Sequence, residues 1–175
     1  MLIVFTGNGK GKTTAALGQM LRAHGQGKRV AMFQFIKGPW VSGEHLFVKR
    51  FQKNTKDFFI YRGGKGFVGI LGDSLPFSEH KKSAHDTLKK IQKAVASKQW
   101  DMIVCDEINV AVFLKLIRAS DVLRVIAKAP KSVVIVFTGR NAPNSFIKKA
   151  DLVTEMKDIK HPYARGKKAC VGFEF

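Results

Sequence analysis

Glycines and cations alternate near the start of the chain in a pattern that suits phosphate binding. The segment Gly7-Asn8-Gly9-Lys10-Gly11-Lys12-Thr13-Thr14 follows an apolar run at residues 2–6. A glycine-rich loop of this kind turns backbone N–H groups toward an anion, and the following helix adds the positive end of its dipole. The Lys12 ammonium is expected to reach phosphate oxygens, and the Thr13 hydroxyl is expected to bind Mg²⁺. We therefore predict that residues 7–14 hold a polyphosphate.

This loop departs by one position from the usual pattern G-x-x-x-x-G-K-[ST]. Counting back from Gly11, the first glycine is due at position 6, where the chain has Thr6, and Gly7 follows it. The loop is one residue short by this measure, which predicts that it holds a polyphosphate differently from an ordinary ATPase. A chance glycine-rich turn is the alternative; the apolar run before the loop and the helical pattern after it favour a phosphate site.

Two further groups of polar residues follow apolar runs that predict buried strands. Asp106 and Glu107 follow residues 100–105, and Arg140 comes shortly after residues 132–137. A carboxylate at the end of a buried strand can hold Mg²⁺ or its water, and an arginine can bind phosphate through two parallel hydrogen bonds. We expect these groups to join the phosphate loop. In a hydrolase Glu107 would polarise water; the structural alternatives are a helix-capping acidic pair and a surface arginine.

A further apolar run, residues 29–36, closes with residues that could contact a ligand: Gln34, Lys37 and Trp40. Ligands of open α/β sheets bind at the carboxyl ends of strands, where these residues are expected. Residues 62–76 combine five glycines with the apolar side chains Phe67, Val68, Ile70 and Leu71. That composition fits either a lid over an apolar ligand or a loop packed on its own domain. The sequence leaves both open.

Apolar periodicity predicts alternating strands and helices. Strands are expected at residues 2–6, 29–36, 57–61, 100–105, 132–137, 150–156 and 169–175, and helices at 13–24, 43–51, 110–117 and 121–129, with one more beginning near Ser78. Nearly continuous apolar strands suit a parallel sheet covered on both faces. We therefore predict an α/β fold with a mostly parallel sheet flanked by helices, forming a single domain over residues 1–175.

Composition limits the classes of protein that are possible. The contents of 45% hydrophobic and 25% charged residues are ordinary for a globular protein, but the net charge of +18 is not. Such a charge fits polyanionic partners or a solvated basic face. Because the lysines are scattered along the chain, we prefer the solvated face and do not expect a nucleic acid partner.

Cysteines and histidines give no metal spacing. Cys105 lies in an apolar run and is expected to be a small buried residue, and Cys170 stands alone. His80 and His85 are five residues apart on a predicted helix, so with Asp86 they are expected to be exposed. The chain begins directly at its first strand and has no apolar run long enough to span a membrane, which predicts a cytoplasmic protein.

Several motifs occur together in a fixed order: Thr6-Gly-Asn-Gly-Lys-Gly-Lys-Thr-Thr14, Gln34-Phe-Ile-Lys-Gly38, Gly43-Glu44, Asp106-Glu-Ile-Asn109, Thr138-Gly-Arg140, Lys160-His161 and Gly166-x-x-Ala169-x-x-Gly172. In this order they resemble the ATP:corrinoid adenosyltransferases of the phosphate-loop type. The resemblance covers nearly the whole chain, and the ordered set is far more specific than the loop alone.

The resemblance implies a RecA-like phosphate-loop fold. It implies transfer of the 5′-deoxyadenosyl group of ATP to the Co(I) centre of a reduced corrinoid, with release of triphosphate, in adenosylcobalamin biosynthesis or salvage. ATP as co-substrate, Mg²⁺, a homodimer and an electron donor that reduces Co(II) to Co(I) are implied as well. ATP would lie reversed relative to most phosphate-loop enzymes, which agrees with the short loop.

The resemblance also implies residue roles. The loop would hold the triphosphate, and two cations would neutralise the leaving group, Lys12 and Arg140. The expected Mg²⁺ ligands are Thr13 and Glu107, with Asp106 in support. A ribose, base or corrin edge would approach Gln34, Lys37 and Trp40. No protein nucleophile is needed, because Co(I) is itself the nucleophile.

Two features depart from the family pattern. Some members place a Phe, and a Trp two positions later, against the lower face of the corrin; here Phe67 matches the first, but Gly69 stands at the second. The expectation is that Phe67, Ile70 or Leu71 supplies the apolar contact. Some members also carry an N-terminal helical extension that covers the site, and in this chain the corrinoid is expected to be less enclosed.

Two other functions remain open at this stage. One is a RecA-like nucleic-acid-binding ATPase that uses Glu107 to activate water, although no helix-turn-helix, zinc-finger or RNA-binding signature supports it. The other is a corrinoid carrier without catalytic activity that uses ATP as a regulator. The identity of the products separates both from an adenosyltransferase.

Overall fold

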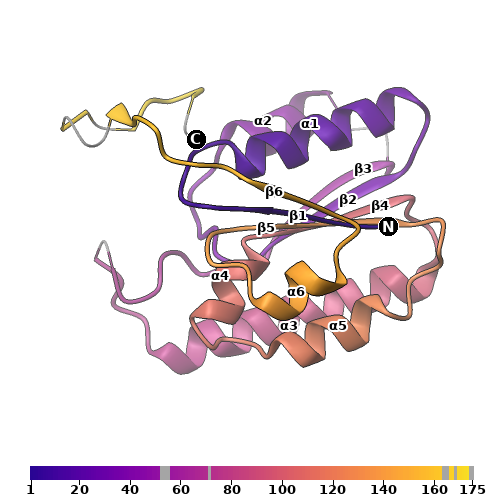
Figure 1. The fold of residues 1–175 in the computed structure, drawn as a ribbon. Helices are drawn as coiled ribbons and strands as arrows, with labels where there is room; N and C mark the ends of the chain where they lie inside the picture. Colours follow the sequence, from indigo (N-terminus) through magenta and orange to yellow (C-terminus); the bar gives the residue numbers. More distant parts are fainter. Residues whose placement is uncertain (52–55, 71, 163–165, 168, 174–175) are drawn as a thin grey trace.

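A parallel sheet organises the molecule. The computed structural model describes residues 1–51, 56–70, 72–162, 166–167 and 169–173. Within these residues the sheet has six strands in the order β3-β2-β4-β5-β1-β6, and every pairing is parallel (Figure 1). The strands are β1 (Leu2–Thr6), β2 (Val30–Gln34), β3 (Phe58–Arg62), β4 (Met102–Asp106), β5 (Val134–Thr138) and β6 (Leu152–Glu155). The predicted α/β fold class is confirmed.

Helices cover both faces of the sheet. In Figure 1, α1 (Lys12–Gly25) and α2 (Gly43–Phe51) lie on one face, and the opposite face carries α3 (Phe77–Ser97), α4 (Ile108–Phe113), α5 (Ala119–Ile126) and α6 (Asn144–Lys149). Successive strand residues face opposite ways, so each strand serves two cores. Ile3 packs with Met20 on the α1 side, and Val4 packs with Ile91 on the α3 side. Because all the strands are parallel, their carboxyl ends meet at one edge of the sheet.

The predicted elements differ from the structure at a few places. The expected final strand is wrong in its described part, because residues 169–173 form coil and turn. Helix α6 was not predicted; it begins after Pro143 and is only six residues long, too short for a periodic signal. Helix α3 begins at Phe77, next to the predicted start at Ser78, and Pro76 holds the extended conformation that precedes the first turn.

His80 corrects another expectation. Its side chain is buried, whereas His85 and Asp86 are exposed as predicted. The His80 Nε2 atom lies 3.0 Å from an Asp73 carboxylate oxygen, and Asp73 also accepts the backbone N–H groups of Gly69 and Leu75. The turn before α3 is therefore fastened to the helix. A helical-face argument could not find this contact, because Asp73 lies outside the helix.

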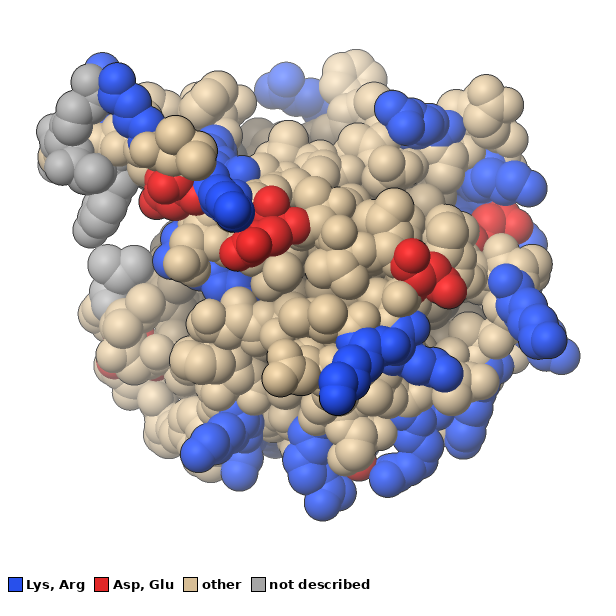
Figure 2. Space-filling view, viewed as in Figure 1, with Lys and Arg blue, Asp and Glu red and all other residues tan. Residues whose placement is uncertain are grey.

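Basic side chains are spread over the face of the molecule that Figure 2 shows. Figure 2 shows many Lys and Arg side chains at the bottom of the view, the side on which Figure 1 places α3 and α5. Two acidic residues of these helices form ion pairs: Asp86 with Lys89, and Asp121 with Arg118 and Arg124. Among the described helices, none combines the length and the apolar character needed to cross a membrane.

Candidate nucleotide site

The loops that follow β1, β4 and β5 meet at the carboxyl edge of the sheet. The phosphate loop follows β1 and leads directly into α1, with Gly11 as the residue before the helix. Its backbone rests on the segment after β6: the Gly9 N–H donates to the Met156 carbonyl at 2.7 Å. Gly7 has a φ of +92°, and a Cβ atom there would lie 2.4 Å from the same carbonyl oxygen. Only glycine fits this approach.

Lys12 is buried within the phosphate loop. Its Nζ atom donates to the carbonyl oxygens of Gly7 and Gly9, at 2.8 and 2.6 Å. Burial lowers the pKa of Lys12 from its ordinary value, the charge of Glu107 opposes that shift, and the charge of Arg140 adds to it. An ammonium group is thus held at the centre of the loop, where the oxygens of a bound phosphate could replace the two carbonyls.

Asp106 forms the opposite wall. Its side chain is fully buried, and one carboxylate oxygen accepts the hydroxyl groups of Thr13 and Thr138, at 2.8 and 2.7 Å. Burial raises the pKa of Asp106, while these hydrogen bonds oppose the rise. The residue that sequence reasoning placed in support therefore orients the Thr13 hydroxyl. Thr138, which had no assigned role, completes the contact from β5.

Glu107 stands next to this contact in a left-handed backbone conformation, with φ +60°. Its backbone N–H donates to the Thr138 hydroxyl at 2.9 Å, which fixes the turn after β4. Burial, and then the charge of Asp106, raise the pKa of Glu107 to about 7, while Lys12 and Arg140 oppose that rise. Arg140 is exposed, and its charge acts on both Lys12 and Glu107. We call these five residues the phosphate corner: Lys12, Thr13, Asp106, Glu107 and Arg140.

Gln34 connects the phosphate corner to α2. Its side chain is fully buried, and its amide nitrogen donates to Asp106 at 3.3 Å and to Glu44 at 3.1 Å. Its amide oxygen accepts a hydrogen bond from His45 Nε2 at 2.8 Å. The amide group is thus engaged by protein partners on both of its atoms.

His45 determines which way the Gln34 amide points. The backbone N–H of Ser42 donates to His45 Nδ1 at 3.1 Å, so Nδ1 must be an acceptor and Nε2 carries the proton. Nε2 then donates to the Gln34 oxygen, which leaves the Gln34 NH₂ group facing the two carboxylates. Burial lowers the pKa of His45, which favours this neutral form. Sequence reasoning missed His45, because nothing local to Gly43-Glu44 reveals a partner eleven residues earlier.

Lys37 is anchored in the same region. Its ammonium group pairs with Glu44 and donates to the Ser42 hydroxyl, the latter at 3.1 Å. Burial would raise the pKa of Glu44, but the contacts with Lys37 and Ser42 prevail and lower it to about 2. Trp40, three residues beyond Lys37, is instead 60% exposed. Of the three residues predicted at this strand end, the structure engages two internally and leaves the tryptophan open to solvent.

The glycine-rich segment after β3 is packed on the loop after β2. The N–H groups of Gly63 and Gly64 both donate to the Gln34 carbonyl, and that of Gly66 donates to the Ile36 carbonyl at 3.0 Å. Residues 63–66 of this segment therefore form a loop packed on its own domain, one of the two interpretations that the sequence left open. Phe67 and Ile70 nevertheless remain exposed, and Leu71 lies outside the described residues.

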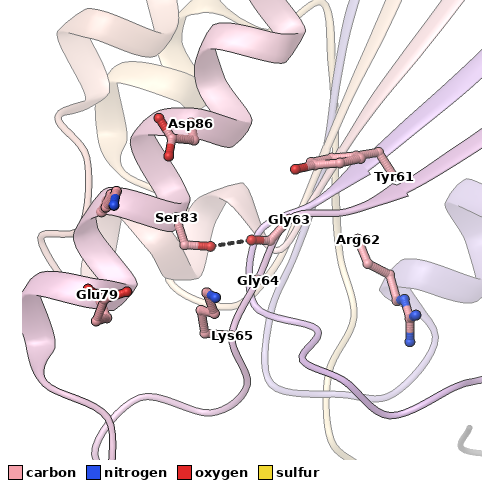
Figure 3. Close-up of a pocket in the computed structure, with 9 residues that line it drawn as sticks. Tyr61, Arg62, Gly63, Gly64, Lys65, Glu79, Ser83 and Asp86 are labelled. Atoms are coloured by element: carbon pink, nitrogen blue, oxygen red, sulfur yellow. Dashed lines mark hydrogen bonds between the residues drawn. The ribbon is translucent and has the colours of Figure 1, made fainter.

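A cavity of about 380 Å³ lies on the other side of this segment, between the end of β3 and the first half of α3. Figure 3 shows Tyr61 pointing toward α3, whereas Arg62 points away from the helix. The Ser83 hydroxyl donates to the Gly63 carbonyl across the cavity floor. The cavity contains none of the phosphate-corner residues and mixes both signs of charge, with Lys65 and Lys82 beside Glu79 and Asp86.

The sheet order and the phosphate corner define a RecA-like phosphate-loop fold. A flagellar accessory protein, FlaH from Methanocaldococcus jannaschii, has a similar solved structure, with a TM-score of 0.56, 14% identity, and coverage of 88% of this chain and 70% of that one. At that identity the likeness concerns the fold alone.

The chain belongs to the family of ATP:corrinoid adenosyltransferases BtuR/CobO/CobP, whose model matches residues 1–175. It is similar to corrinoid adenosyltransferases of Sinorhizobium sp. (36% identical), Pseudomonas aeruginosa (35%) and Escherichia coli K12 (30%). Each match covers 100% of this chain and 80%, 83% and 85% of those proteins, respectively. The enzyme class predicted from the ordered motifs is confirmed.

Proposed function

We propose that this protein transfers the 5′-deoxyadenosyl group of ATP to the Co(I) centre of a reduced corrinoid and releases triphosphate. Membership of the adenosyltransferase family supports ATP-dependent adenosylation of a corrinoid. The observation that carries the finer proposal is the position of the phosphate corner. The phosphate corner lies at the same edge of the sheet as the exposed Trp40 and Phe67, so a nucleotide and an apolar ring could bind side by side there.

The reaction needs no protein nucleophile. An electron pair of Co(I) forms the Co–C bond to C5′ of ATP, while the C5′–O bond breaks and its electron pair leaves with triphosphate. Cobalt is formally oxidised to Co(III), and the carbon is reduced correspondingly. The task of the protein is to position the reactants, to stabilise the charge on the leaving group and to exclude water.

Residue roles follow from the charges and contacts of the phosphate corner. The N–H groups of residues 7–14 and the ammonium of Lys12 would bind triphosphate oxygens. Arg140 is exposed and close enough to act electrostatically on Lys12, so it could pair with the same anion. Gln34 would act through Asp106, because its amide is already bonded to that carboxylate. Lys37 and Trp40 would lie toward the second substrate.

The donor set fits Mg²⁺. That ion takes hard oxygen ligands, usually one or two carboxylates together with substrate phosphates and water. The Thr13 hydroxyl lies 2.8 Å from Asp106, and Glu107 follows directly, which gives one hydroxyl and two carboxylates at one corner. Thr13 and Glu107 would hold the ion, with Asp106 in support. When bound, Mg²⁺ would neutralise charge on the triphosphate.

Phe67 is proposed as an apolar contact for the corrin ring, on the family resemblance and on its 44% exposure beside the site. We further propose a role in adenosylcobalamin biosynthesis or salvage, with action as a homodimer in the cytoplasm. A separate electron donor would reduce Co(II) to Co(I).

The test is an anaerobic assay with ATP, Mg²⁺ and chemically reduced cobalamin. Adenosylcobalamin, followed by the corrin spectrum, and triphosphate, followed by anion-exchange chromatography, are expected in equal amounts. Omitting the corrinoid should abolish triphosphate release. Formation of ADP and phosphate without corrinoid dependence would support the nucleic-acid-binding ATPase instead, and binding without a Co–C bond would support a carrier.

A further inference from the structure

Two loops at the carboxyl edge are joined through glycine. Gly38 follows β2 and Gly66 follows β3; a Cβ atom on Gly38 would lie 2.7 Å from Gly66 Cα, so the two backbones touch directly. The hydrogen bond from Gly66 N–H to the Ile36 carbonyl holds them together at 3.0 Å. Gly66 has a φ of +115°, a conformation that side chains rarely adopt. The two loops are therefore closely packed, and their contact requires glycine at both positions.

Arg62 fixes the backbone of the tryptophan. Its guanidinium donates to the carbonyl oxygens of Pro39 and Trp40, both at 3.0 Å. Figure 3 shows the Arg62 side chain pointing away from α3, as alternation along β3 requires when Tyr61 points toward it. The Gly66 backbone also lies close to the Trp40 ring, because a Cβ atom on Gly66 would be 3.2 Å from it.

This scaffold presents an aromatic pair to solvent. The Trp40 and Phe67 rings lie 5.8 Å apart and are inclined by 38°. Both remain largely exposed, at 60% and 44%, although each packs against the other. An apolar surface held in place by this many contacts has already lost the freedom that binding would otherwise remove. We call the pair, with loops 36–40 and 63–67, the aromatic platform.

The aromatic platform and the phosphate corner are physically continuous. Lys37 pairs with Glu44, Glu44 accepts the amide of Gln34, and the same amide donates to Asp106. An apolar ligand on the platform would therefore lie beside a nucleotide held at the phosphate corner. A corrin ring is a flat macrocycle with an apolar face, which is the kind of surface that a pair of aromatic rings contacts well.

We propose that Trp40 and Phe67 together form the contact surface for the corrin ring, and that Trp40 supplies the second aromatic ring that position 69 lacks. This inference rests on the proposed function. Gly69 has no side chain, and its N–H is bonded to Asp73 at 2.8 Å, so its turn is tied toward α3. The tryptophan reaches the platform from the loop after β2 instead. Trp40 is thereby a specificity residue for the corrinoid and not for ATP.

The test compares Trp40→Ala, Phe67→Ala and the double variant with a matched control, Phe51→Ala. Phe51 is an exposed aromatic residue at the end of α2, away from the carboxyl edge. Each variant is assayed anaerobically with reduced cobalamin, and the KM values for corrinoid and for ATP are measured separately. Thermal unfolding and sedimentation of each variant accompany the kinetics.

Trp40→Ala should raise the KM for the corrinoid about tenfold, as loss of an aromatic contact predicts, while the KM for ATP stays within about twofold. Trp40→Phe should recover most of the loss. The double variant should lose less than the product of the single losses, because the two rings touch. Phe51→Ala should match the wild type in both KM values.

Three results would overturn the inference. One is an unchanged KM for the corrinoid in Trp40→Ala while Phe67→Ala raises it; another is a rise in the KM for ATP instead. The third is a change in sedimentation with unchanged kinetics, which would make the platform a contact between two copies of the chain. Failure of the wild type to form adenosylcobalamin would reject the proposed function itself, and is thus a distinguishable outcome.

Discussion

The phosphate corner and the aromatic platform lie at the same sheet edge but are built in opposite ways. In the corner, Lys12 and Asp106 are buried and hydrogen-bonded to neighbours, as with Asp106 between Thr13 and Thr138. In the platform, apolar rings are exposed and the buried contacts are made by glycine backbone, as with Gly38 against Gly66. The corner thus brings charged groups together, whereas the platform fixes the position of two aromatic rings.

The two regions should therefore respond differently to substitution. A buried polar group that loses its partner retains the cost of desolvation, so changes in the corner should be severe and independent of which corrinoid is used. An exposed ring loses only its contact with the ligand, so changes in the platform should be milder and specific for the corrinoid.

Lys12→Ala should give the largest loss. Removing a charge that faces the leaving triphosphate should lower kcat by roughly 10²–10³. The loss should be the same for every corrinoid, since Lys12 belongs to the phosphate corner. Single-turnover rates with two corrinoids measure it, and circular dichroism checks the fold. Wild-type turnover in this variant would reject the phosphate-loop assignment.

Gly66→Ala should impair the platform through its backbone. A residue with a side chain at a φ of +115° is strained, and its Cβ atom would press on the Trp40 ring at 3.2 Å. We expect a loss of stability of about 1–2 kcal/mol, measured by urea unfolding, together with a raised KM for the corrinoid.

Gly72→Ala is the control for that prediction. Gly72 also has a positive φ, +79°, but no described atom lies within 4 Å of a Cβ there. It should lose stability without any change in the KM for the corrinoid. Equal KM changes in both variants would mean that the Trp40 contact is irrelevant.

His45→Phe should weaken the phosphate corner from a distance. Without the Nε2 donor, the Gln34 amide is free to turn its oxygen toward Asp106, and partners of this outer kind typically alter metal affinity by about 10–100-fold. The Mg²⁺ concentration that gives half-maximal activity should rise by roughly tenfold.

His45→Gln retains an N–H donor and should restore most of the Mg²⁺ response, whereas His85→Phe on the exposed face of α3 should have no effect. A loss in His45→Phe that appears only as a lower melting temperature, with an unchanged Mg²⁺ response, would argue for a purely structural role. The comparison with Gln separates the hydrogen bond from the volume of the side chain.

Glu44→Gln should show the smallest effect, and it should depend on pH. Contacts with Lys37 and Ser42 hold the pKa of Glu44 at about 2, below its ordinary value. A lowered pKa stabilises the fold at pH values above the pKa of the unfolded chain, and that contribution is lost as the pH falls toward about 2. Because its partner Lys37 is 29% exposed, solvent screening of the pair should limit the contribution to below about 1 kcal/mol.

Urea unfolding at several pH values measures this difference. Wild type should exceed Glu44→Gln by a constant amount above about pH 5, and the two should converge at lower pH. The same substitution at Glu79, at the start of α3, controls for general charge removal. A difference that grows on acidification would contradict the assigned cause.

Most of the fold could be predicted from local pattern. Apolar runs gave β1, β2, β4 and β5 near their observed ends, because each of these strands is buried on both faces. Local pattern failed where burial depends on a partner elsewhere. His80 is buried because Asp73 reaches it, and residues 169–173 of the expected final strand are exposed coil and turn.

The site divides in the same way. The residues of the phosphate corner were all named from their types and their positions after strands, and the structure brings them together because the carboxyl ends of parallel strands meet at one edge. The contact between His45 and Gln34 and the packing of Trp40 against Phe67 were not found. Both join residues from different elements, and neither residue type specifies its partner.

From the sequence alone came the prediction of a polyphosphate site, the charged side chains that meet at one sheet edge, and the family that the chain resembles. These follow from motif chemistry, since an ammonium, a hydroxyl and two carboxylates act wherever strands bring them to one edge. The tertiary structure was needed to show that the glycine-rich segment after β3 packs on the loop after β2, and that Trp40 is exposed beside Phe67. That arrangement depends on two backbones touching at glycine, a contact between segments that are distant in the chain and that no local pattern records.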